Sequence, residues 1–194
     1  MCGKFQLLGH AVDSTLQCPT SAIASQTAVP MEDTMKHSVQ LLGYIAIQEE
    51  VVLTYNASDT KLAVHSDARY LSGPKARSRA GGPFFLSGET LTPGNNGTVR
   101  NIAHIVKHIM SSATEAGLAG LYIMAREAVY IRILLEEIGH KQPPTPLQTE
   151  NLMADAVCND KIQTYQGNGY VVSLVEGQII SEKKRTQYIG GQVS

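Results

Sequence analysis

The chain has 194 residues, of which 43% are hydrophobic and 17% are charged, and its formal net charge is -1. This length fits one globular domain with an appendage. The balanced charge excludes a protein that is drawn to nucleic acid by its overall charge, so any such contact has to be local.

The first 50 residues predict a loose start and then a helix. Residues 1–30 are rich in Ser, Thr, Ala and Gln with weak periodicity, so we expect them to be loose or partly helical. Glu32 and Asp33 favour a helix N-terminus through the helix dipole. Apolar residues then recur at helical spacing, which predicts an amphipathic helix to about residue 48 with the stripe Met35, Val39, Leu42 and Ile45.

Short strands are predicted next. Residues 51–55 form the first candidate, and residues 56–59 have the composition of a turn. Residues 62–65 continue as a second strand that ends at Asp67.

A basic loop follows at residues 74–79. Beyond it, residues 84–86 and 99–106 are strand candidates, separated by turn-forming residues at 93–97. The cations of the loop are Lys75, Arg77 and Arg79.

The strongest helix prediction covers residues 114–138. Ser112 and Glu115 fit a capping box, and Gly139 marks the end of the helix. Its apolar stripe consists of Leu118, Leu121, Ala125, Val129 and Ile133. A short strand at 147–149 and a short helix at 152–158 follow, so the order of elements predicts a mixed α/β fold.

The composition changes at Thr164. Residues 170–175 and 178–180 flank Glu176-Gly177 in the pattern of a hairpin, and the rest of the tail looks unstructured.

Six segments, in this order, resemble the end of a copia-type retrotransposon polyprotein, where the last part of the reverse transcriptase precedes an RNase H domain. They are Leu53 to Tyr55, Leu62 to Ala68, Ala76 to Gly82, Asn95 to Val99, Ser111 to Ala116 and Pro144 to Thr149. The resemblance implies a truncated RNase H-like mixed sheet with one long and one short helix at 51–163. A helical reverse-transcriptase remnant at 1–50 would precede it, and a divergent tail at 164–194 would follow.

The family cleaves the RNA strand of an RNA-DNA hybrid with two Mg²⁺ ions held by converging carboxylates. By the resemblance, Asp67 is the first acid and Glu150 stands where the family has Asp, so these two are the catalytic and metal positions. The helix acid is replaced by Gly117, and a fourth acid has no counterpart. Glu115 lies about 200° around the helix from position 117 and is not expected to substitute.

We therefore expect an inactive remnant, with Mg²⁺ as cofactor only where activity survives. An active Mg²⁺-dependent ribonuclease H and a recruited protein-interaction module are the alternatives. The expected partner is an RNA-DNA hybrid, bound weakly or only by the ancestor. Lys75, Arg77 and Arg79 would contact its phosphates, with solvated loop charges as an equal alternative.

The sequence of the tail suggests a separate hypothesis about its reading frame. Residues 167–178 can be encoded so that another reading frame gives a family segment, which suggests a frameshift near Thr164 that removed the final strand, the fourth acid and the last helix. The nucleotide sequence of the gene decides this.

Pro83 argues against the family's sheet arrangement. It would lie in a strand that is internal in that sheet, where Pro removes a hydrogen bond of the ladder.

The remaining signals are general. Leu7-Leu8 is too short for a signal peptide and no run of about 20 apolar residues occurs, so we expect an intracellular protein, cytoplasmic or nuclear, without membrane contact. The distant cysteines form no disulfide or zinc pattern. Asp155 and Asp160 are expected at the surface, and His104 and His108 at ordinary polar positions.

Overall fold

The computed structural model describes residues 2–29, 31–48, 50, 52–90, 93–158 and the backbone of 170–175 and 178–182. The helices are α1 (Cys2–Ala11), α2 (Gln17–Ala24), α3 (Glu32–Ile47), α4 (Ala113–Glu137) and α5 (Leu152–Cys158), with short 3-10 turns η1 (Ser14–Leu16) and η2 (Pro74–Ala76). The strands are β1 (Lys61–Gly73), β2 (Arg77–Ser87), β3 (Thr98–Ile105), β4 (Thr145–Thr149), β5 (Tyr170–Val175) and β6 (Gln178–Glu182).

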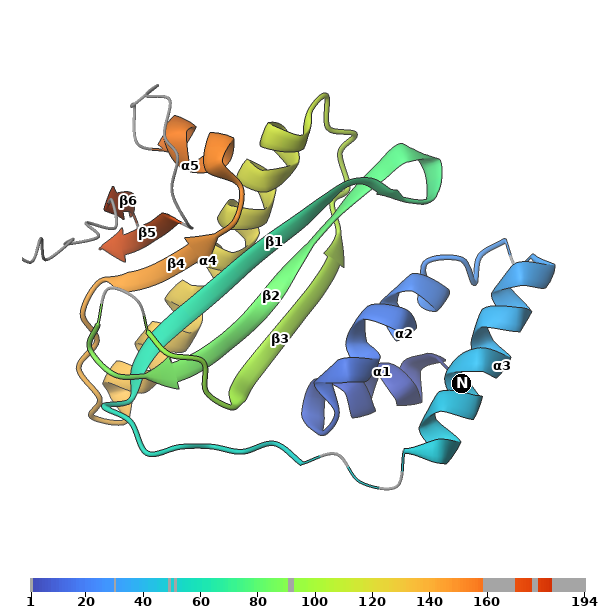
Figure 1. Ribbon diagram of the computed structural model, residues 1–194, viewed down its shortest axis with the longest axis horizontal. Helices are drawn as coiled ribbons and strands as arrows, with labels where there is room; N and C mark the ends of the chain where they lie inside the picture. Colours follow the sequence, from blue (N-terminus) through green and yellow to red (C-terminus); the bar gives the residue numbers. More distant parts are fainter. Residues whose placement is uncertain are drawn as a thin grey trace, which may run out of the picture.

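The strands form a mixed sheet in the order β3-β2-β1-β4-β5-β6. β1 pairs antiparallel with β2 and parallel with β4, and β2 pairs antiparallel with β3. In Figure 1, α4 lies behind the sheet, α1 and α2 lie beside β3, and α3 lies on their far side from the sheet. The predicted mixed α/β class is confirmed, and this arrangement is compatible with an RNase H-like fold.

Strand β2 packs very closely against β1 and β3 at Gly81 and Gly82. A Cβ on Gly82 would overlap the carbonyl oxygen of His65 in β1, and a Cβ on Gly81 would overlap that of Ile102 in β3. The rungs between β1 and β2 are interrupted opposite Gly82 and Pro83. Pro83, which lacks an N–H, is therefore accommodated in an internal strand, contrary to the expectation from the sequence.

Helix α4 covers one face of the sheet and forms the core with it. The hydroxyl of Ser112 accepts a hydrogen bond from the backbone N–H of Glu115 at 3.1 Å, so the predicted N-cap is present. The buried face of α4 includes Gly120 and Leu121, whereas Ile133 of the predicted stripe is 49% exposed. The core between α4 and the sheet includes Leu62, Val64, Phe84, Ile102, Leu121, Met124 and Leu147.

The N-terminal residues are helical rather than loose. The Asp13 carboxylate begins η1 by accepting hydrogen bonds from the N–H and hydroxyl of Thr15 at 3.0 and 2.6 Å. On α2, Gln17 and Ser21 lie one turn apart. Their side chains donate to the backbone oxygens of Asn101 and Ala103 in β3 at 2.8 and 3.0 Å. Helix α2 thus covers the free edge of β3, which limits pairing with another strand.

Helix α3 forms where the sequence predicts it, but its apolar stripe is not buried. Met35 and Val39 are 68% and 61% exposed. The strand predicted at 51–55 is wrong for Val52 to Tyr55, since no strand occurs there, and Val51 lies outside the described residues. Instead, the Tyr55 hydroxyl donates to the backbone oxygen of Thr98 at 3.0 Å.

The hairpin predicted in the tail is present as β5 and β6, and β5 pairs antiparallel with β4. The sheet therefore does not end at β4, as a truncated fold implied. The other tail residues lie outside the described part of the chain. Among the described helices, none combines the length and apolar character that crossing a membrane requires.

Candidate functional site

Asp67 lies within β1 and not at its end, because the strand continues to Gly73. Its neighbours Ser66 and Ala68 face α4, since a Cβ on Gly120 would lie 3.4 Å from Ser66 Oγ and 3.2 Å from Ala68 Cβ. Successive side chains of a strand alternate between the two faces. Asp67 therefore points to the face opposite α4, where it is exposed.

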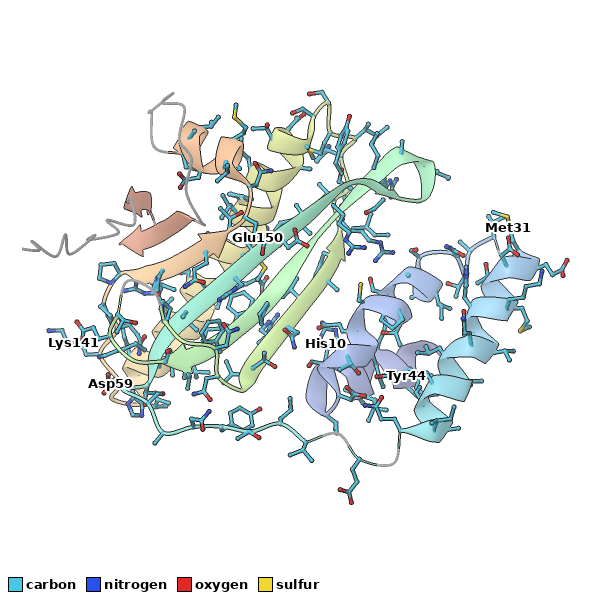
Figure 2. All side chains as sticks on the ribbon, in the orientation of Figure 1. His10, Met31, Tyr44, Asp59, Lys141 and Glu150 are labelled. Carbon is cyan, nitrogen blue, oxygen red and sulfur yellow. The ribbon has the colours of Figure 1, made fainter. Side chains whose placement is uncertain are left out.

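Glu150 follows β4 at the position that corresponds to Asp67. The last rung between the parallel strands joins Ser66 to Thr149, so Asp67 and Glu150 are each the next residue along. Glu150 is exposed, and Figure 2 shows it beside β1. The fold thus brings these two acids to corresponding positions along neighbouring strands, while their role as metal ligands stays a prediction.

Gly117, which stands where the resemblance implies a helix acid, has no room for a side chain. A Cβ there would overlap the amide nitrogen of Asn151 and would lie 3.1 Å from the Cβ of Ala154. The amide is held on both sides: its Nδ2 donates to the backbone oxygen of Ala113 at 3.1 Å, and its Oδ1 accepts from the N–H of Ala154 at 3.0 Å. Asn151 therefore ties α5 to the start of α4 and fills the space beside Gly117.

Glu115 is engaged at the N-terminus of α4. Its Oε2 accepts hydrogen bonds from the hydroxyl and the backbone N–H of Ser111, both at 2.6 Å. These bonds lower the pKa of Glu115. The predicted capping box is thus half correct, because Glu115 binds Ser111 rather than the N–H of Ser112, and its carboxylate already has a structural role.

The lowered pKa of Glu115 should make the fold sensitive to acid. Its bonds to Ser111 contribute stability above the ordinary Glu pKa of 4.5, and this contribution is lost as the pH falls through the lowered value of the folded state. We expect Glu115→Gln to lower Tm at about pH 7 and to reduce the difference between Tm at about pH 7 and about pH 3. Thermal unfolding followed by circular dichroism measures both.

Glu137→Gln is the matched control, because it removes the same charge from the other end of α4. The side chain of Glu137 forms no hydrogen bond or ion pair with the described residues. Its variant should keep the wild-type dependence of Tm on pH, and an equal reduction in both variants would contradict the role given to Ser111.

The described residues do not fit a centre of two Mg²⁺ ions. Such a centre needs several converging carboxylates, and Asp67 and Glu150 supply two. In the part of the chain that the structure describes, no group of three or more His, Cys, Asp and Glu side chains could hold a metal ion. Position 117 is a glycine and supplies no third carboxylate, and the Asn151 amide occupies the adjacent space.

The predicted basic loop is half turn and half strand. Lys75 lies in η2 with a left-handed backbone (φ 57°, ψ 41°), while Arg77 and Arg79 belong to β2. Strand pairing places Arg79 directly opposite Arg69 of β1. Arg69 was not predicted as a contact, because the sequence alone did not show that β1 continues past Asp67 into this hairpin.

Other titratable residues lie apart from the two acids. Asp155 is 3% exposed, so its predicted surface position is wrong, and Asp160 lies outside the described residues. His104 is on β3, where burial lowers its pKa and Glu127 partly opposes the shift. Cys158 is a free thiol, and its pKa is raised by burial and by the nearby Asp155.

A separate hollow of about 480 Å³ lies between α2 and α3. Its lining is mostly apolar and includes Pro19, Ile23, His37, Leu41 and Tyr44. None of the predicted site residues lines this hollow, so it is not part of the candidate site formed by Asp67 and Glu150.

Neither a protein-family model nor a curated protein sequence matches the chain. A relation to copia-type RNase H domains therefore depends on the resemblance of the six segments quoted above.

Proposed function

We propose that this chain is a catalytically inactive remnant of a copia-type retrotransposon RNase H domain, whose ancestral substrate was an RNA-DNA hybrid. The observation that carries the loss of activity is the Asn151 amide, which is bonded to Ala113 and Ala154 and occupies the space beside Gly117. The lost acid has thus been replaced by a packing contact.

The ancestry is supported by the order of the elements. A central β1 pairs with β2 on one side and with the parallel β4 on the other, and a long helix connects β3 to β4. In this arrangement Asp67 and Glu150 each follow the last paired residues of β1 and β4, Ser66 and Thr149. These are the two positions at which the resemblance implies acids.

Two carboxylates are too few for the ancestral reaction. Two-metal cleavage needs enough negative charge to hold both ions and to fix their positions. Removing one ligand disturbs charge balance and geometry together, which normally abolishes the reaction. The pair that remains is the one feature that favours the alternative of an active Mg²⁺-dependent ribonuclease H.

We expect no cleavage of an end-labelled RNA-DNA hybrid by the purified chain in millimolar Mg²⁺. An active ribonuclease H on the same hybrid is the positive control, and Asp67→Asn and EDTA are the negative controls. Gel electrophoresis of the RNA strand measures the product. Cleavage that requires both Mg²⁺ and Asp67 would overturn the proposal and establish the active alternative.

A further inference from the structure

The hairpin of β1 and β2 extends past Asp67 as an arm that carries four cations and no acid. We define the basic arm as Ala68 to Ala80, with Arg69, Lys75, Arg77 and Arg79 as its cations. From residue 68 to residue 114 the chain has six Lys and Arg but one acid, Glu89. A strongly positive region therefore lies inside a chain whose net charge is -1.

Strand pairing brings two of these charges together. Arg69 lies directly opposite Arg79, and side chains at such positions share one face of a sheet with Cβ atoms roughly 5 Å apart. Like charges in this position are destabilising. Within the described residues, none of the four cations of the basic arm forms an ion pair; the Arg79 guanidinium has Ser21 Oγ at 3.5 Å.

The end of the arm adds two further charges and is conformationally strained. Lys75 and Arg77 are exposed. Leu71, Lys75 and Ala76 have φ between 52° and 57°, a left-handed backbone that is unfavourable for L-residues. Unpaired charge and strain both oppose folding, so the arm is poorly explained as a device for stability.

We propose that the basic arm binds the phosphate backbone of a nucleic-acid duplex. Unpaired Arg and Lys side chains are the groups that neutralise phosphates and release their counterions. A single strand is disfavoured as the ligand, because single-strand binding relies on aromatic stacking. Tyr70, the aromatic residue of the arm, donates its hydroxyl to the backbone oxygen of Ser111 at 3.0 Å.

Binding by the arm does not depend on the two acids. Arg69 and Arg79 contact phosphates without sequence preference, so duplex DNA and an RNA-DNA hybrid should both bind. The inference rests on the nucleic-acid ancestry proposed above but requires no cleavage. Binding measured in EDTA is therefore separate from the cleavage assay in Mg²⁺, and either result can fail alone.

The test compares Arg69→Gln/Arg79→Gln with the wild-type chain by fluorescence anisotropy on a labelled duplex in EDTA, over a range of salt. We expect Kd to rise by at least about tenfold at low salt, and the slope of log Kd against log salt to fall by about 2. Lys4→Gln/Lys36→Gln is the matched control. It removes two positive charges from exposed positions on α1 and α3 and should bind nearly as the wild type does.

Stability gives an independent readout. Removing the like charges at Arg69 and Arg79 should keep or raise Tm while binding is lost, whereas a structural role would lower both. If that variant does not fold, Lys75→Gln/Arg77→Gln at the end of the arm should show the same loss of binding. The proposal is overturned if the wild type binds no duplex at low salt or prefers anionic lipid vesicles. Equal losses in the arm and control variants would overturn it as well.

Discussion

Replacing Gly117 with Glu should destabilise the fold and leave hybrid cleavage absent. The new Cβ would overlap the Asn151 amide and press on Ala154. Moving Asn151 would break its bonds to Ala113 and Ala154. Overpacking and the loss of this helix cap together predict a decrease of about 2–4 kcal/mol in the free energy of unfolding. Urea denaturation measures it.

Gly43→Glu is the matched control, because Gly43 is an exposed glycine inside α3 and a Cβ added to it would meet no atom within 4 Å. The same substitution there should be neutral or stabilise the protein by about 0.5 kcal/mol through helix propensity. In a double-mutant cycle, Asn151→Gly should offset part of the cost of Gly117→Glu, since it removes the overlapping amide. Additive effects would contradict the contact between the two residues.

The elements that could be predicted from the sequence are those whose limits are set locally. Helix α4 begins at the hydroxyl of Ser112 and ends before Gly139, which has φ 96°. Both signals lie within a few residues of the helix. The observed bounds of α5 and β4 also agree with the predicted ones within two residues.

The basic arm could not be predicted in the same way. Arg69 to Leu71 and Arg77 to Arg79 show no alternation of apolar and polar residues, and their strand conformation depends on their pairing with each other. Strand propensity reflects such context more than intrinsic preference. For this reason the prediction ended β1 at Asp67, described residues 74–79 as a loop and missed Arg69.

The opposite error occurred at Val52 to Tyr55, which has the residue types of a strand but pairs with none. Its neighbour Asn56 is instead held by Asn96, whose Oδ1 accepts from the Asn56 N–H at 2.8 Å and whose Nδ2 donates to the Asn56 oxygen at 3.0 Å. The side-chain amide of Asn96 thus holds the backbone of Asn56 in place. Such contacts between residues 40 positions apart leave no local pattern.

In the candidate site, too, local motifs could be predicted from the sequence, whereas contacts between distant segments could not. The positions of Asp67 and Glu150 come from the motifs, but the register that aligns them comes from the parallel pairing of β1 with β4. Asn151 was not singled out, although an Asn directly before a helix is a common N-cap. Its contact with Gly117 joins two helices and could not be read from either segment.

Gly82→Ala should be among the most damaging single substitutions in the sheet. The added methyl group would meet the carbonyl oxygen of His65, which is backbone and cannot rotate away, and would also approach Met124 at 3.3 Å. Relief requires β2 to move from β1, at the point where β2 also pairs with β3. We expect a loss of about 3 kcal/mol or more in the free energy of unfolding, measured by urea denaturation.

Gly94→Ala is the control, since a Cβ at Gly94 would meet nothing within 4 Å. The comparison also bears on the basic arm. Arg79 lies three residues before Gly82 on β2, so a shift of β2 would disturb its position opposite Arg69. Under conditions where Gly82→Ala is still folded, duplex binding should weaken although no charge has been removed. Wild-type stability in Gly82→Ala would show that β1 and β2 are not as close as the His65 carbonyl indicates, and the register that pairs Arg69 with Arg79 would then have to be revised.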